Sequence, residues 1–146
     1  TEHGPRGGDE VNLIVPTSNY GWPVVASSIN YSGSPFQVPF NGPNQNFTVP
    51  AFRWLPSIGA SGLDIAKGPA FPGWEGDLLA GGLAGQNLDR IRVKDGMMVE
   101  REELLQGIGR VRDIRVHRDG TVYLVMNMNR RGTDIPDKIL RLVPVQ

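Results

Sequence analysis

The stretch from Gly109 to Met128, Gly-Arg-Val-Arg-Asp-Ile-Arg-Val-His-Arg-Asp-Gly-Thr-Val-Tyr-Leu-Val-Met-Asn-Met, contains the pattern that decides the fold. Ile114 and Val116 alternate with charged residues, the pair Asp119-Gly120 follows, and an apolar run resumes at Val122. Alternation with a period of two, interrupted by a glycine-containing turn pair, is typical of a β-hairpin. We therefore expect two antiparallel strands joined by a tight turn.

Two arginines, Arg110 and Arg112, stand just before the first of these strands. Residues two apart in an extended strand lie on the same side, so both guanidinium groups are expected to project together. Paired guanidinium groups suit a ligand with several carboxylates. The same pattern also allows ordinary salt bridges to Asp9, Glu10 or Asp113, and the residues alone leave both alternatives open.

The composition limits the class of protein. A length of 146 residues predicts a single domain over residues 1–146. The 15 basic residues equal the 15 acidic ones, so no net charge attracts nucleic acid, and we expect no nucleic-acid partner. The sequence has no apolar run near the roughly 20 residues that a spanning helix needs, which predicts no membrane partner. The absence of cysteine excludes a disulfide framework and leaves the compartment open.

Many short strands are expected along the chain. The 19 glycines and 12 prolines are typical of strands joined by turns, and they indicate an all-β fold. Trp22 is expected to be a core aromatic residue between turns. Besides the hairpin, the predicted strands are Asp9–Ile14, Phe52–Trp54, Leu63–Ala66, Asp77–Leu83, Leu88–Val93, Met97–Glu103 and Lys138–Val143.

The chain has an internal period. Strands that begin near Val11, Leu63 and Ile114 recur at about 51 residues, and a glycine-containing loop leads into each. Repeats of roughly 40 to 50 residues with four strands each are typical of a β-propeller, whose blades stack around an axis. A β-sandwich is the alternative, but it does not explain the repeated loops. We therefore predict an all-β propeller with four-stranded antiparallel blades, about three in this chain, at residues 1–54, 55–106 and 107–146.

This architecture predicts a site. The first strand of each propeller blade lines the central channel, so the loops that lead into these strands should gather at one end. They bring the backbone carbonyls of Gly4 and Pro5, the hydroxyl of Ser57 and the two arginines. Calcium readily takes backbone carbonyl oxygens, so the set suits an anionic ligand beside a hard cation. The three loops are Glu2–Asp9, Leu55–Ser61 and Gly107–Arg112.

Five motifs, in order along nearly the whole chain, resemble the soluble pyrroloquinoline-quinone-dependent aldose and glucose dehydrogenases and the glucose/sorbosone dehydrogenase group around them. They are Glu2–Ile14, Asn19–Pro23, Phe71–Leu78, Arg110–Asp113 and Asp119-Gly120. The resemblance implies a six-bladed propeller that oxidises aldose sugars at the anomeric carbon by hydride transfer to the quinone. It also implies a periplasmic or secreted location and a sugar substrate as partner.

The resemblance gives roles to the residues of the predicted site. It implies that the carbonyls of Gly4 and Pro5 bind calcium, that Arg110 and Arg112 contact the carboxylates of pyrroloquinoline quinone, and that Ser57 provides a hydroxyl contact. Calcium would act as a Lewis acid on the quinone, and the arginines would fix its orientation.

The resemblance assigns no catalytic residue to this chain. The catalytic histidine of the family lies in an earlier blade, so neither His3 nor His117 is expected to be the base. At the position where several members carry a lysine that meets the cofactor, this chain has Ala84. One cationic contact to the quinone is therefore missing.

The length also departs from the family. A six-bladed ring needs about 300 residues at about 50 per blade, so 146 residues correspond to half a ring. We expect the C-terminal half of a sugar dehydrogenase, inactive alone. The alternative is a half-propeller that serves as a binding or assembly module, in which two copies self-associate through exposed blade faces into a six-bladed ring without redox activity.

Overall fold

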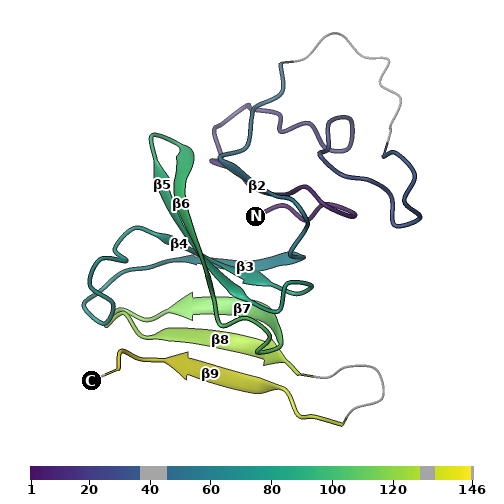
Figure 1. Ribbon diagram of the computed structural model, residues 1–146. Coiled ribbons are helices and arrows are strands. Elements are labelled where there is room, and N and C mark those ends of the chain that lie inside the picture. The colour runs from purple at the N-terminus through teal and green to yellow at the C-terminus, as the bar shows by residue number, and fades with distance from the viewer. Residues whose placement is uncertain (37–45, 129–133, 146) are drawn as a thin grey trace.

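A computed structural model describes residues 1–36, 46–128 and 134–145 (Figure 1). Within these ranges the regular structure is all β, with three antiparallel sheets and no helix, so none of the described residues lies in a membrane-spanning helix. The predicted all-β class is confirmed. The strands are β1 Asp9–Val11, β2 Phe52–Trp54, β3 Ala60–Ile65, β4 Leu78–Gly82, β5 Leu88–Lys94, β6 Met97–Leu104, β7 Arg110–Val116, β8 Val122–Asn127 and β9 Lys138–Leu142.

The sheets follow the order of the chain. β1 pairs with β2, the strands β3 to β6 form a four-stranded sheet, and β7 to β9 form a three-stranded sheet, each with neighbours in sequence paired side by side. The four consecutive strands predicted in the middle of the chain are therefore present. β3 begins at Ala60, three residues before the expected start at Leu63.

The hairpin predicted from the first motif is confirmed. β7 pairs with β8 in antiparallel register, with Val116 opposite Val122. In the turn between them the Gly120 N–H donates to the His117 carbonyl at 2.9 Å, and Gly120 adopts a φ of 88°. This left-handed conformation favours glycine because a Cβ would clash with the backbone.

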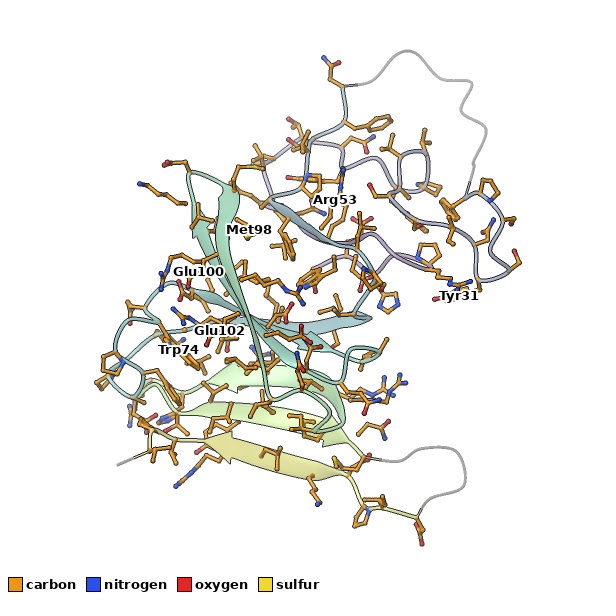
Figure 2. The ribbon with its side chains drawn as sticks, in the orientation of Figure 1. Tyr31, Arg53, Trp74, Met98, Glu100 and Glu102 are labelled. Carbon is orange, nitrogen blue, oxygen red and sulfur yellow. The ribbon has the colours of Figure 1, made fainter. Side chains whose placement is uncertain are left out.

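The outer part of the four-stranded sheet carries a network of ion pairs, of which Figure 2 labels the carboxylate residues Glu100 and Glu102. The buried carboxylate of Asp77 accepts from Arg90 Nε at 2.6 Å and from Arg92 Nε at 3.1 Å. Across the strand pair, Arg90 Nη1 meets Glu102 at 2.7 Å and Arg92 Nη1 meets Glu100 at 2.6 Å. These contacts tie β5 and β6 to the loop before β4.

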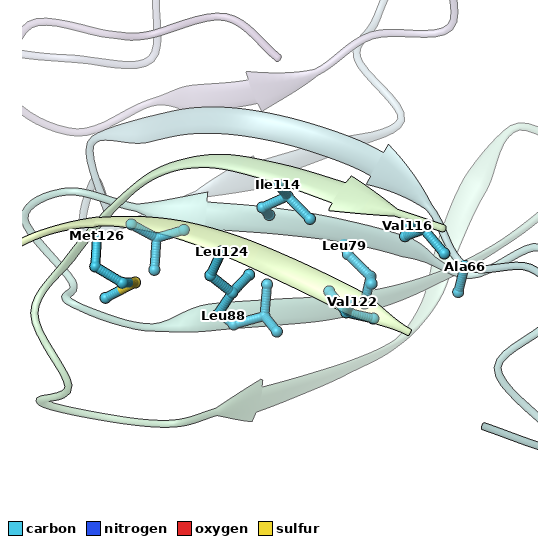
Figure 3. Close-up of a cluster of buried hydrophobic side chains, with 9 residues drawn as sticks. Ala66, Leu79, Leu88, Ile114, Val116, Val122, Leu124 and Met126 are labelled. Atoms are coloured by element: carbon cyan, nitrogen blue, oxygen red, sulfur yellow. The ribbon is translucent and has the colours of Figure 1, made fainter. Parts of the chain in front are cut away.

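The main core lies between the four-stranded and the three-stranded sheets (Figure 3). Side chains from β4 and β5 face those from β7 and β8, and each fully buried aliphatic side chain stabilises the fold by about 1.5–3 kcal/mol. The buried members are Ala66, Leu79, Leu88, Val111, Ile114, Val116, Val122, Leu124 and Met126.

A smaller core joins β1 and β2 to the four-stranded sheet. Its largest member, Trp54, is 1% exposed and donates from its indole N–H to Asp89 Oδ2 at 2.5 Å. Asp89 is fully buried and also accepts from Arg101 Nε at 2.7 Å. A buried carboxylate is tolerated because its oxygens are hydrogen-bonded and paired with a cation.

Hydrogen bonds between the first strands of successive sheets repeat with the period seen in the sequence. Asp9 Oδ2 accepts from the Ala60 N–H at 2.7 Å, and Asp64 Oδ2 accepts from the Val116 N–H at 2.8 Å. In each case a carboxylate on the first strand of one sheet accepts a hydrogen bond from the backbone of the first strand of the next sheet. The first strands β1, β3 and β7 therefore follow one another in space as they do along the chain.

The prediction for Trp22 is wrong. Half of its side chain is exposed, and its ring stacks on Phe36 with centroids 5.3 Å apart. Within the described residues 12–36 no residue lies in a strand, and the only β-bridges are those of Ile29, so no sheet face covers the tryptophan. An aromatic residue among turns has no core to enter unless a sheet is adjacent.

Candidate functional site

An open pocket of about 810 Å³ lies where the loops before the first strands meet. Pro5, Ser57 and Arg110, from three loops far apart in sequence, all line it. The predicted convergence of these loops is therefore present. Ala84, from the turn between β4 and β5, also lines the pocket and brings no charge to it.

The first loop is shaped by glycines and by Asp9. The Gly4 N–H donates to Asp9 Oδ1 at 2.9 Å, and a Cβ on Gly4 would lie only 2.3 Å from the Gly7 carbonyl oxygen. Only glycine fits such a close approach. The carbonyl oxygens of Gly4 and Pro5 accept no hydrogen bond from any described residue. Gly4 itself is buried and does not belong to the described lining of the pocket, whereas Pro5 does.

The second loop is held by the turn between β4 and β5. The Ala84 N–H donates to the Ile58 carbonyl at 2.7 Å, and the Gly59 N–H donates to Ser57 Oγ at 3.1 Å. Ser57 Oγ thus accepts from its own loop, which leaves its hydroxyl proton available to a ligand in the pocket.

Arg110 is one of two arginines that line the pocket, the other being Arg6. The Nε of Arg110 is buried and has no hydrogen-bond partner. The acidic residues considered as salt-bridge partners are engaged elsewhere: Glu10 with Arg53 Nε at 3.0 Å, and Asp9 and Asp113 with backbone N–H groups. Within the described part of the chain neither predicted arginine forms an ion pair, so the salt-bridge alternative is not observed there. A guanidinium whose Nε is buried without a partner favours an anionic ligand.

Arg112 is placed differently from Arg110. The register of β7 against β8 shifts between Val111 and Asp113, so a β-bulge falls at Arg112. A bulge adds one residue to a strand and breaks the two-residue alternation from which both arginines were expected on one side. Arg112 is exposed and does not belong to the described lining of the pocket.

The two histidines lie in different surroundings. His3 lines the pocket, with Nδ1 3.2 Å from the Ala60 carbonyl oxygen, so the tautomer that donates from Nδ1 is favoured. His117 lies in the β7–β8 turn, 3.0 Å from Asp119 and outside the pocket lining. The backbone N–H of Thr121, followed by the His117 side chain, lowers the pKa of Asp119 to about 2.

One wall of the pocket was not predicted. Residues 26–29 and Tyr31 line it, together with Arg6. The signal for this wall was the pair Gly7-Gly8: a Cβ on Gly8 would lie 2.5 Å from the Ser27 carbonyl oxygen. Adjacent glycines indicate that another segment approaches closely, but they do not say which one.

No cluster of three or more histidine, cysteine or acidic side chains that could hold a metal ion occurs among the described residues. A cation in this pocket would therefore depend on backbone carbonyls and water, which suits calcium better than zinc or another transition metal.

Antiparallel sheets that follow one another along the chain, with their connecting loops gathered around one pocket, define a propeller-like all-β protein. Sequence comparison then identifies the family. The Glucose / Sorbosone dehydrogenase family matches residues 1–140, and the chain belongs to it. The resemblance found in the five motifs is confirmed.

Individual relatives agree with this assignment. The chain is 36% identical over 131 residues to an aldose sugar dehydrogenase of Escherichia coli, covering 85% of this chain and 34% of that protein. A crystal structure of glucose dehydrogenase matches with a TM-score of 0.82 and 36% identity, over 99% of this chain and 40% of that one. The PQQ-bound aldose sugar dehydrogenase of Streptomyces coelicolor matches with a TM-score of 0.66 and 27% identity, over 97% and 38%. The chain spans about a third of the length of the curated relatives it matches.

Proposed function

We propose that this chain is part of a quinoprotein sugar dehydrogenase, which oxidises aldose sugars at the anomeric carbon by hydride transfer to pyrroloquinoline quinone. The observation that carries the proposal is the buried, unpartnered Nε of Arg110 in a pocket whose described lining contains no carboxylate. Pyrroloquinoline quinone is a tricarboxylate, so it supplies the charge that this pocket lacks. Family membership and a PQQ-bound structural relative support the same cofactor.

Each predicted residue has a role in this proposal. Arg110 binds a carboxylate of the quinone from the pocket wall, and Arg112 reaches the same ligand from the exposed bulge. Ser57 donates its hydroxyl proton. The carbonyls of Gly4 and Pro5, which accept no hydrogen bond from the described residues, bind calcium. When bound, calcium makes the quinone more electrophilic toward hydride.

The three sheets are, in this proposal, parts of three propeller blades at residues 1–54, 55–106 and 107–146, half of a six-bladed ring. No residue of this chain is assigned the role of catalytic base, so the chain alone is expected to bind the cofactor without turning over sugar. Enzyme-like rates of sugar-dependent dye reduction, measured after addition of quinone and calcium, would contradict this part. The family resemblance supports a periplasmic or secreted location, which fractionation of the source cells would test.

Calorimetric titration with quinone and calcium tests the cofactor site. We expect saturable binding that weakens about tenfold or more in Arg110→Gln, because a charge-assisted hydrogen bond to a desolvated carboxylate is lost. Arg115→Gln is the matched control, since Arg115 lies on the same strand and is exposed. Absence of heat at high micromolar quinone, or equal affinities of the two variants, would remove the cofactor proposal.

An exposed apolar surface supports a second candidate function, a half-propeller that assembles with a second copy. Val125 and Ile139 are 43% and 73% exposed and lie opposite each other on β8 and β9. An apolar face of this kind marks an association surface. Two copies would then form one six-bladed ring. Sedimentation should give twice the 16.0 kDa of one chain, whereas a stable monomer would exclude this candidate.

A further inference from the structure

Tyr31 lines the pocket, yet most of its large aromatic side chain is exposed to solvent. It is 74% exposed, and its phenol and ring make no hydrogen bond or ring contact with a described residue. Figure 2 shows its side chain at the edge of the N-terminal region. A tyrosine in this position contributes little to the stability of the fold, because its apolar surface remains in water.

The backbone that carries Tyr31 is nevertheless held in place. The Gly33 N–H donates to the Asn30 carbonyl at 2.8 Å, and the Asn30 N–H donates to the Ser34 carbonyl at 2.9 Å. The Asn30 side chain also donates to the Pro35 carbonyl at 3.0 Å. Tyr31 is thus the second residue of a turn closed from both ends. A fixed turn with an unpacked aromatic ring is preorganised for a ligand.

The turn is also tied to the loop that carries Gly4 and Pro5. The Ile29 N–H donates to the Arg6 carbonyl at 3.3 Å, and the two residues form an antiparallel bridge. The guanidinium of Arg6 lies against the turn, with Nη1 3.9 Å from where a Cβ on Gly33 would be. The ring of Tyr31 and the cation of Arg6 are therefore carried by two segments whose backbones are joined at one rim of the pocket.

An aromatic ring beside a guanidinium suits a sugar. The C–H bonds on one face of a pyranose form an apolar surface that packs on an aromatic ring, and its hydroxyl oxygens accept from a guanidinium. The pocket wall near Arg110 is suited to an anion. A neutral sugar would therefore lie toward the open side, where the rim is.

We propose that Tyr31 is a substrate-specificity residue on which the sugar ring stacks, with Arg6 donating to its hydroxyls. The assignment of a sugar as the ligand rests on the proposed function. It predicts that the quinone and the sugar are bound by separable parts of the pocket, the quinone by Arg110 and the sugar by the rim.

Ligand-observed saturation-transfer NMR with D-glucose on the full chain, with and without quinone and calcium, tests this. Tyr31→Ala should weaken glucose binding about fivefold or more, and Tyr31→Phe should stay within about twofold because the ring is kept. Tyr123→Ala is the matched control, since Tyr123 is an exposed tyrosine on β8 outside the pocket lining. The calorimetric affinity for quinone should be unchanged in all three variants.

The inference would be overturned by the absence of a glucose signal on the unmodified chain, or by equal glucose affinity in Tyr31→Ala and Tyr123→Ala. An equal loss in Tyr31→Phe and Tyr31→Ala would assign the effect to the hydroxyl and also overturn stacking. Failure of the proposed function is read separately, as absence of quinone heat on the unmodified chain. Tyr31→Ala should unfold at the same temperature as the unmodified chain, which excludes a folding defect.

Discussion

The two interfaces between neighbouring sheets are built from different chemistry. Between the four-stranded and three-stranded sheets, fully buried aliphatic side chains such as Leu88 and Leu124 meet. Between β1–β2 and the four-stranded sheet, the contact is smaller and contains the buried carboxylates of Asp9 and Asp89, which hold Ala60 and Trp54. Both carboxylates accept hydrogen bonds, so the geometry of this interface depends on where each donor group lies.

The difference explains where the pocket lies. An apolar interface tolerates small shifts because dispersion contacts are non-directional, whereas a carboxylate that accepts two backbone N–H groups fixes the loops that supply them. Asp9 holds both Gly4 and Ala60 in this way. The polar interface therefore positions the loops around the pocket, and the apolar interface buries the larger set of aliphatic side chains.

The largest expected effect is at the apolar interface. Leu124→Ala should lower the free energy of unfolding by about 3 kcal/mol, since it removes buried methyl groups and leaves a cavity. Val125→Ala, the next residue on the exposed face of β8, should stay within about 0.5 kcal/mol. Urea denaturation measures both. Equal losses would mean that the core is not on the side of Leu124.

The next effect is at the polar interface. Asp9→Asn should cost about 2 kcal/mol, because the amide offers one acceptor oxygen where two backbone N–H groups need acceptors. It should also weaken the proposed binding of calcium, since the loop with Gly4 loosens. Asp95→Asn is the control, an exposed turn residue whose φ of 52° asparagine tolerates. A destabilisation without change in calcium affinity would separate Asp9 from the site.

A smaller effect is expected for Asp64, which adds one polar contact to the apolar interface. Asp64→Ala removes the hydrogen bond to the Val116 N–H and should cost about 1 kcal/mol. The cost should be less than for Asp9→Asn because the second bond of Asp64 is only to the adjacent Ile65 N–H, whereas Asp9 holds Gly4 as well as Ala60. Quinone affinity should not change. A larger loss of unfolding free energy in Asp64→Ala than in Asp9→Asn would contradict the different roles given to the two interfaces.

The smallest effect concerns Glu2, which forms a β-bridge with Glu10 of β1. Burial, followed by repulsion from Glu10, raises the pKa of Glu2 above its usual 4.5. A raised carboxyl pKa means that the folded state binds the proton more tightly, so the group lowers stability as pH rises above the unfolded value. Glu2→Gln should therefore be slightly more stable than the unmodified chain at pH 7 and indistinguishable from it below about pH 4. Denaturation midpoints across this range provide the check, and a less stable variant at pH 7 would reverse the sign.

Much of the fold could be predicted from short-range patterns. The alternation around Ile114 and the pair Asp119-Gly120 were enough for the hairpin, since strand period and turn chemistry depend on adjacent residues. The repeat of about 51 residues was enough to predict that the loops of Pro5, Ser57 and Arg110 meet at one pocket. The cofactor and calcium roles of these residues remain proposals.

Three features could not be predicted, and each depends on a partner distant in sequence. Trp22 was expected in the core, but no sheet among the described residues covers it. The bulge at Arg112 is defined only by the pairing of β7 with β8. The pocket wall with Tyr31 is built by contact with the first loop.

By itself, the sequence determined the strands, the hairpin turn, the repeat and the family, because these depend on residue type and spacing along the chain. Tertiary structure alone decided that Arg110 faces the pocket unpaired while Arg112 lies on a bulge, and that Asp9 joins two loops. Burial and hydrogen-bond partners are set by packing between segments about fifty residues apart, and no local pattern encodes them.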